Sequence, residues 1–136
     1  MSKAEITAIE HKFLNATSTD ELMVFLDEDV VRYTFIPPLQ YVGAKAVRAL
    51  FDQFFASLKN FKGEFISLDV ICDGNMGVAY SLQQAAWTNP DGTPGEATFR
   101  VTDCFHKVNG AWKIFHAHIS VPINPATGQA EMNLKQ

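Results

Sequence analysis

An aspartate and three histidines lie in a segment whose other residues are typical of buried strands. The segment reads FRVTDCFHKVNGAWKIFHAHISVP at positions 99–122 and carries Asp103, His106, His116 and His118. A carboxylate beside an imidazole fixes the tautomer of the ring and raises the basicity of its other nitrogen, which makes a general base near neutral pH. The alternative is a buried hydrogen bond that only satisfies two polar groups of a stable sheet. The residue types alone leave both interpretations open.

The Asn-Gly pair at 109–110 sets the predicted register of this segment, because it is the strongest short signal for a two-residue hairpin turn. Strict alternation from that turn places Asp103 opposite His116 and Val101 opposite His118 on one inward face. A single β-bulge would reverse part of this assignment. We therefore predict that Asp103 and His116 form a catalytic pair and that Val101 and His118 line the same pocket.

The other face of the hairpin carries Arg100, Thr102 and His106 in this register. We expect His106, close to the turn, to be a solvated surface histidine. Arg100 and Thr102 are expected to contribute to a hydrogen-bond network between subunits. The two faces of the hairpin thus have different predicted roles.

Other side chains near this hairpin could bind a ligand or a metal ion. Two histidines two residues apart could hold a metal with Asp103 as the third ligand, but the spacing is a weak signal, and we predict neither a metal site nor a cofactor. Tyr33 and Tyr41 are predicted to orient a ligand at the pocket mouth through their hydroxyl groups, with core packing as the alternative. Phe54 belongs to a phenylalanine-rich helix that either packs in the core or walls the cavity.

The elements that position these residues follow a simple order along the chain. A capping box starts a helix at Ser2, a second one starts at Ser18, and apolar residues at helical spacing follow Gly43. The predicted strands are 30–35, 64–72, 77–88, 96–108 and 111–121. We therefore predict an α+β domain, a cone in which three N-terminal helices pack on a strongly curved antiparallel sheet. One domain is expected over 1–136, with a polar tail at 124–136 lying loosely on the surface.

Composition excludes several classes of function. The net charge is −4 and no basic run occurs, which argues against a nucleic-acid partner. No apolar stretch reaches the roughly 18 residues of a membrane span. The N-terminus has no apolar region typical of a signal peptide. Two isolated cysteines, Cys72 and Cys104, favour a reduced setting, and we predict a cytoplasmic protein.

The segment 99–122 resembles the terminal hairpin of the nuclear transport factor 2-like superfamily, in its SnoaL-like branch, and the resemblance to ketosteroid-isomerase-like proteins extends over most of the chain. It implies a cystatin-like cone around an apolar pocket and a homodimer packed through the outer face of the sheet. Members include isomerases, cyclases, dehydratases and epoxide hydrolases, and also transport and assembly domains without chemistry. The fold therefore does not decide the function.

The resemblance carries over only part of a known catalytic set. Ketosteroid isomerases place a carboxylate base at the position of Thr34 and a tyrosine at the position of Glu10, which can donate a hydrogen bond only if it is protonated. Their aspartic acid on the penultimate strand corresponds to Asp103, which is retained. This partial match argues against steroid isomerisation by that mechanism.

The chain also resembles the association domain of calcium/calmodulin-dependent kinase II, which places Tyr80, Leu82 and Gln84 on the pocket side. Leu82 and Asp103 replace two arginines of an anion-binding pocket there, which argues against the same anionic ligand. We predict a small-molecule-binding protein with an apolar pocket, and leave open whether it is also an enzyme performing cofactor-free acid–base chemistry of the isomerase, dehydratase or hydrolase kind on a small apolar substrate. The alternative is a non-catalytic dimerisation or association module.

Overall fold

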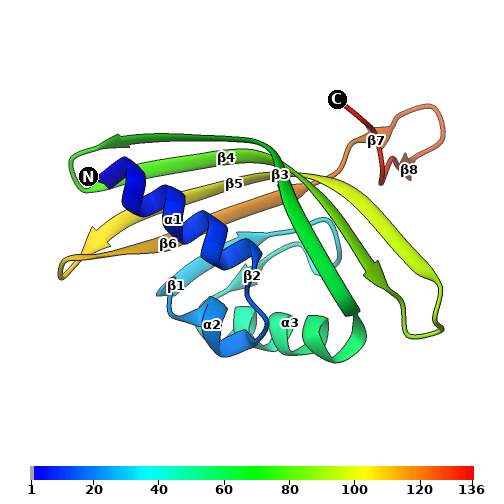
Figure 1. The fold of residues 1–136 in the computed structure, drawn as a ribbon, viewed down its shortest axis with the longest axis horizontal. Helices are drawn as coiled ribbons and strands as arrows, with labels where there is room; N and C mark the ends of the chain where they lie inside the picture. Colours follow the sequence, from blue (N-terminus) through cyan, green and yellow to red (C-terminus); the bar gives the residue numbers. More distant parts are fainter. Residues whose placement is uncertain (1) are drawn as a thin grey trace.

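The computed structural model describes residues 2–136, and it contains three helices on the inner side of a curved six-stranded sheet (Figure 1). The helices are α1 (Ser2–Leu14), α2 (Thr19–Met23) and α3 (Ala44–Ser57). The strands of the sheet are β1 (Leu26–Tyr33), β2 (Tyr41–Val42), β3 (Lys59–Asp73), β4 (Met76–Thr88), β5 (Pro94–Val108) and β6 (Ala111–Ser120). They lie in the order β2–β1–β6–β5–β4–β3.

The second helix begins at an N-cap serine, Ser18, supported by the carboxylate of Glu21. The backbone N–H of Glu21 donates to the hydroxyl of Ser18, at 3.3 Å, and the carboxylate of Glu21 accepts from the backbone N–H of Thr17, at 2.6 Å. These contacts satisfy amide groups that the first turn of a helix otherwise leaves without a partner. The third helix begins directly after Gly43, whose φ of 90° favours glycine.

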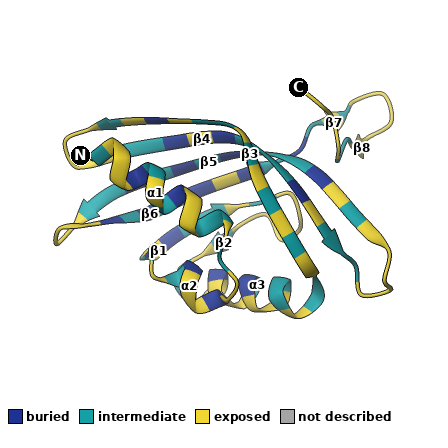
Figure 2. Cartoon of the chain, in the orientation of Figure 1, coloured by how far each residue is buried: buried dark blue, intermediate teal, exposed yellow. Residues whose placement is uncertain are grey.

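Small side chains on the inner face of the sheet let the helices approach it closely. Ala79, Ala85, Ala97 and Ala117 lie on three neighbouring strands and are almost inaccessible to solvent. Buried positions, in dark blue, recur along these strands (Figure 2). A β-carbon at Gly77 would lie 2.5 Å from the δ-carbon of Ile6 on α1, so this position has no room for a side chain. The inner face is therefore the buried face.

The prediction of an antiparallel sheet is wrong for one pair of strands. β1 pairs with β6 in the parallel direction, through Arg32 beside Ala117 and Tyr33 beside His118. Only strands joined by a tight hairpin are forced to be antiparallel. A long stretch of chain separates β1 from β6, so the sheet is mixed.

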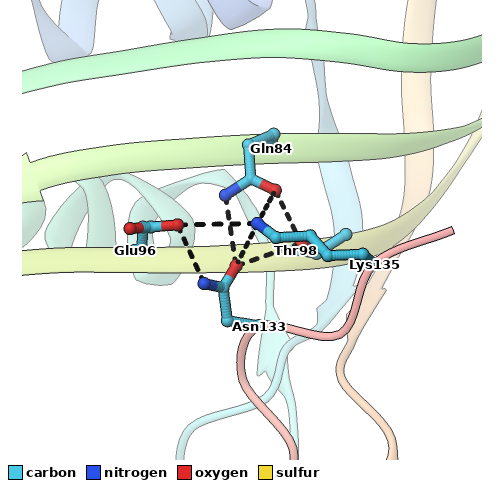
Figure 3. A network of polar contacts seen from close by, with 5 residues as sticks. All are labelled: Gln84, Glu96, Thr98, Asn133 and Lys135. Carbon is cyan, nitrogen blue, oxygen red and sulfur yellow. Dashed lines mark hydrogen bonds and ion pairs between the residues drawn. The ribbon is translucent and has the colours of Figure 1, made fainter.

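The C-terminal tail is attached to the sheet, so the expectation of a loose tail is wrong. It forms a hairpin of β7 (Ile123–Asn124) and β8 (Gln129–Ala130), and the backbone N–H of Thr98 donates to the carbonyl of Met132 at 2.8 Å. Beyond the hairpin, Asn133 donates to Glu96 at 2.8 Å (Figure 3). Lys135 donates to Gln84 at 3.1 Å in the same network (Figure 3).

Candidate functional site

A β-bulge in the last hairpin changes the predicted register. Phe105 lies opposite Ile114, as alternation from the turn requires, but the next pair is Cys104 with His116, and Asp103 lies opposite Ala117. Phe115 is the extra residue of the bulge, and an extra residue moves every later side chain to the other face. The predicted pairing of Asp103 with His116 is therefore wrong.

His116 and His118 lie on the outer face of the sheet, not in the interior. The Nδ1 atom of His116 is 2.8 Å from the carbonyl oxygen of Val31. Tyr33 packs edge-on against both imidazoles, with ring centroids 4.7 Å from His116 and 5.5 Å from His118. Because His118 is exposed, these three rings form a surface cluster.

Asp103 does point inward, and its neighbour there is Glu10 of α1. Both carboxyl groups are buried, with exposed fractions of 2% for Glu10 and 4% for Asp103. Burial, the charge of Asp103 and a hydrogen bond with Asp103 raise the pKa of Glu10 to about 11. Burial also raises the pKa of Asp103, against the hydrogen bond from Glu10 and the charges of Arg32 and His116, which lower it. At neutral pH the Glu10 carboxyl therefore carries a proton and donates it to a hydrogen bond with Asp103.

Arg32 on β1 lies on the same inner face, level with Asp103 two strands away. Its guanidinium carbon is 5.1 Å from the centre of the Phe51 ring, a cation–π contact. Desolvation lowers the pKa of Arg32, while the nearby Asp103 and Tyr41 raise it. The inner site therefore combines a carboxyl pair, a guanidinium and a phenol, and we call Glu10, Asp103, Arg32 and Tyr41 the inner polar cluster.

The other predicted ligand-binding residues lie in different places. Val101 is buried on the inner face, two residues from Asp103, and Tyr41 is on the inner side, where its hydroxyl donates to the carbonyl of Pro37 at 3.2 Å. Phe54 lies in an aromatic group with Phe55 and Phe61. The structure thus brings Val101 and Tyr41 to the side of Asp103, and places Phe54 on α3.

Tyr80 and Gln84 lie on the outer face, so their predicted place on the pocket side is wrong. On β4 the inner positions are Ala79, Ser81 and Ala85, which are buried. Small residues at Gly77, Ala79, Ser81 and Ala85 accommodate the helices, although Gln83 shares this face and donates to the hydroxyl of Ser81 at 3.0 Å. The alternation of small residues in AYSLQQAA could have revealed this register.

His106 is not a free surface histidine. Its Nε2 atom contacts the carboxylate of Asp27 at the start of β1, and its ring lies 4.9 Å from that of Phe115. Hydrogen bonds from the backbone of Asp29 and from His106 lower the pKa of Asp27. The pair ties the turn end of β5 to the entry of β1, so its role is structural.

Glu10 and Arg32 were missed as site residues, although both left a signal in the sequence. Glu10 follows Ile6 by four residues, so it falls within the apolar stripe of its helix. Arg32 interrupts the apolar run VVRYTF. A charged residue on a buried face is uncommon without a partner, which makes both positions candidates.

A hollow of about 520 Å³ lies beside the end of α1, within the size range of small-molecule pockets. It is lined by Leu14–Thr17, by Phe61–Glu64 of β3 and by Gln84–Ala86 of β4. Leu14 follows Glu10 by one turn and shares its face of α1. The hollow therefore lies one helical turn along α1 from Glu10, and neither carboxyl of the pair lines it.

A family model described as a SnoaL-like domain matches residues 6–124. The chain belongs to the SnoaL-like family. A search of curated proteins finds no significant match.

Solved structures of the nuclear transport factor 2-like kind share the fold of this SnoaL-like protein at low sequence identity. A protein of unknown function from Pseudomonas putida is 22% identical, with a TM-score of 0.89 and coverage of 99% of this chain and 96% of that one. A ketosteroid isomerase-like protein from Erwinia carotovora is 18% identical, with a TM-score of 0.76 and coverage of 88% and 95%. A candidate dehydratase from Streptomyces avermitilis is 13% identical, with a TM-score of 0.80 and coverage of 89% and 97%.

Two further searches concern metal ions and membranes. Within residues 2–136, no three histidine, cysteine or carboxylate side chains gather as a metal ion requires. None of the helices in that part of the chain is long and apolar enough to cross a membrane.

Proposed function

We propose that this SnoaL-like protein binds a small, mainly apolar molecule inside the cone and acts on it by cofactor-free acid–base chemistry. The observation that carries the proposal is the buried Glu10–Asp103 pair, two carboxyl groups that share a hydrogen bond and whose pKa values are both raised by burial. Two carboxyl groups that share one proton are typical of an acid and a base at one active site.

The two carboxyl groups would have different roles. The Asp103 carboxylate would remove a proton from a carbon next to a carbonyl group, because a desolvated carboxylate with a raised pKa is a stronger base than a solvated one. Glu10 would donate its hydrogen bond to the carbonyl oxygen and stabilise the developing enolate. Return of the proton to another carbon gives isomerisation, and loss of a hydroxyl group that Glu10 protonates gives dehydration.

The resemblance to ketosteroid isomerases requires a hydrogen-bond donor at the position of Glu10, which a glutamate supplies only when it is protonated. Glu10 occupies the position of a hydrogen-donating tyrosine, and a carboxyl with a pKa near 11 can donate in the same way at neutral pH. The solved relatives described as ketosteroid isomerase-like and as a candidate dehydratase are consistent with proton transfer at carbon. No carboxylate stands at Thr34, so the base would be Asp103 itself.

Deuterium exchange at carbon tests this chemistry without knowledge of the natural substrate. A panel of small cyclic ketones is incubated with the protein in D₂O, and loss of the proton signals next to the carbonyl is followed by NMR. We expect the wild-type protein to accelerate exchange for at least one ketone, and Asp103→Asn to remove roughly 10²–10⁴-fold of that rate, the usual contribution of a general base. Asp69→Asn is the matched control, because Asp69 is exposed on β3. Equal rates for Asp103→Asn and wild type would refute the proposal.

We also propose that the protein is a homodimer packed through the outer face of the sheet. Support comes from apolar side chains on that face that lack cover, among them Ile71, 59% exposed, and Tyr80, 46% exposed. Exposed apolar surface of this kind is typical of a protein–protein contact.

A further inference from the structure

The Arg32 guanidinium lacks partners that a cation inside a protein normally has, namely an ion pair and hydrogen-bond acceptors. Within residues 2–136 it takes part in no ion pair, and its Nε atom is buried without a hydrogen-bond partner. Its close contact is the face of Phe51. A buried charge is costly unless it is paired and hydrogen-bonded, so this arrangement calls for an anion.

The nearby acidic residues do not supply that anion directly. Asp103 acts on Arg32 through its charge but forms no ion pair with it, and it accepts the hydrogen bond of Glu10 instead. Glu10 is itself protonated, and its Oε1 atom is a second buried polar atom without a partner. Two unpartnered polar atoms, one on a cation and one on a neutral acid, therefore face the interior of the cone.

We propose that the ligand carries a carboxylate, which binds the guanidinium of Arg32, and an apolar body with the group that Glu10 and Asp103 act upon. The proposal rests on the proposed function and names its substrate class. The planar guanidinium matches a carboxylate through two parallel hydrogen bonds. Rings that pack partly buried against the core, Phe13, Phe55 and Phe99, would contact the apolar body.

The charge of the site favours a singly charged ligand. Arg32 is the one arginine of the described chain on the inner face, because Arg48 and Arg100 are both exposed. The charge of Asp103 already offsets part of the Arg32 charge, so a ligand with one negative charge fits the site better than a phosphate group, which carries nearly two. Arg32 as a whole residue is partly exposed, although its Nε atom is buried.

Matched pairs of ligands test this inference. Binding of benzoate and of hexanoate is measured by calorimetry against benzamide and hexanamide, which keep shape but lack the charge. We expect at least one acid to bind roughly 10- to 100-fold more tightly than its amide, the factor that a charge-assisted hydrogen bond contributes. Arg32→Met should remove this preference, Arg32→Lys should keep part of it, and Arg48→Met on the surface of α3 should leave it unchanged.

The outcomes separate the two proposals. If the amides bind as well as the acids, the carboxylate is not recognised and the inference fails, while ketone exchange through Asp103 can still succeed. If neither acids nor amides bind the wild-type protein, the inference also fails, and the exchange assay decides on the proposed function independently. If Arg32→Met does not fold, the comparison of acid with amide in the wild-type protein and in Arg32→Lys still decides.

Discussion

Replacement of Glu10 by glutamine should make the protein more stable at neutral pH. Glutamine keeps the shape and a hydrogen-bond donor for Asp103, but it cannot titrate. The pKa of Glu10 rises from its ordinary value of 4.5 to about 11 on folding, so folding takes up a proton whenever the pH lies between these values. The contribution of Glu10 to the free energy of unfolding is therefore most favourable below pH 4.5 and decreases as the pH rises towards 11.

The size of the effect at pH 7 follows from the ordinary pKa alone. From pH 4.5 to pH 7 the cost grows by about 1.4 kcal/mol per unit, or about 3 kcal/mol in total, as long as the folded pKa stays above 7. Glu10→Gln removes this cost. We expect the free energy of unfolding of the variant, relative to wild type, to rise by about 1.4 kcal/mol per pH unit between pH 5 and pH 8.

Urea unfolding of both proteins at pH 5, 6, 7 and 8 measures this difference. Glu5→Gln is the matched control, because Glu5 lies on the same helix and is exposed. A difference between wild type and Glu10→Gln that stays constant over this pH range would mean that Glu10 is ionised in the folded protein. The reasoning about the carboxyl pair would then be wrong.

Three further predictions concern other parts of the molecule. Gly77→Ala should lower the free energy of unfolding by about 1–3 kcal/mol, because its β-carbon meets Ile6, and urea unfolding measures this loss. Asp27→Asn removes a carboxylate whose pKa is lowered on folding, so the free energy of unfolding of the variant should fall less than that of wild type as the pH drops below 4. An acid-unfolding profile identical to that of wild type would exclude the Asp27–His106 pair as a contributor to acid stability. Tyr80→Lys should shift the protein from dimer to monomer in light scattering, and a variant that stays dimeric would place the interface elsewhere.

The sequence patterns predicted the fold and the inward position of Asp103. They did not predict the register of β6 against β5, which decides the face on which the histidines lie. Asp103 was correctly placed on the inner face, because the Asn109-Gly110 turn and the alternation of β5 are regular. The bulge at Phe115 has no local signal: a β-branched or aromatic residue fits either face of a strand. The two histidines beyond it were therefore placed on the wrong side.

The true neighbours of Asp103 come from distant parts of the chain. Glu10 lies on the first helix and Arg32 on the first strand, so their meeting depends on how α1 and β1 pack against the sheet. Residue types can mark each as unusual on a buried face, but no spacing rule connects them. The contacts of the C-terminal tail were unpredictable for the same reason. Asn133 and Lys135 meet their partners, Glu96 and Gln84, only when the tail lies along β5.

The central claim is that the Glu10–Asp103 pair holds a proton in the folded protein at neutral pH. The direct measurement is a pH titration of the side-chain carboxyl carbons of Glu10 and Asp103 by NMR, with Glu10→Gln and Asp103→Asn to assign the signals. The account predicts that the signal of Glu10 stays at the position of a protonated carboxyl through pH 8. Ionised signals for both Glu10 and Asp103 at pH 7 would contradict the account.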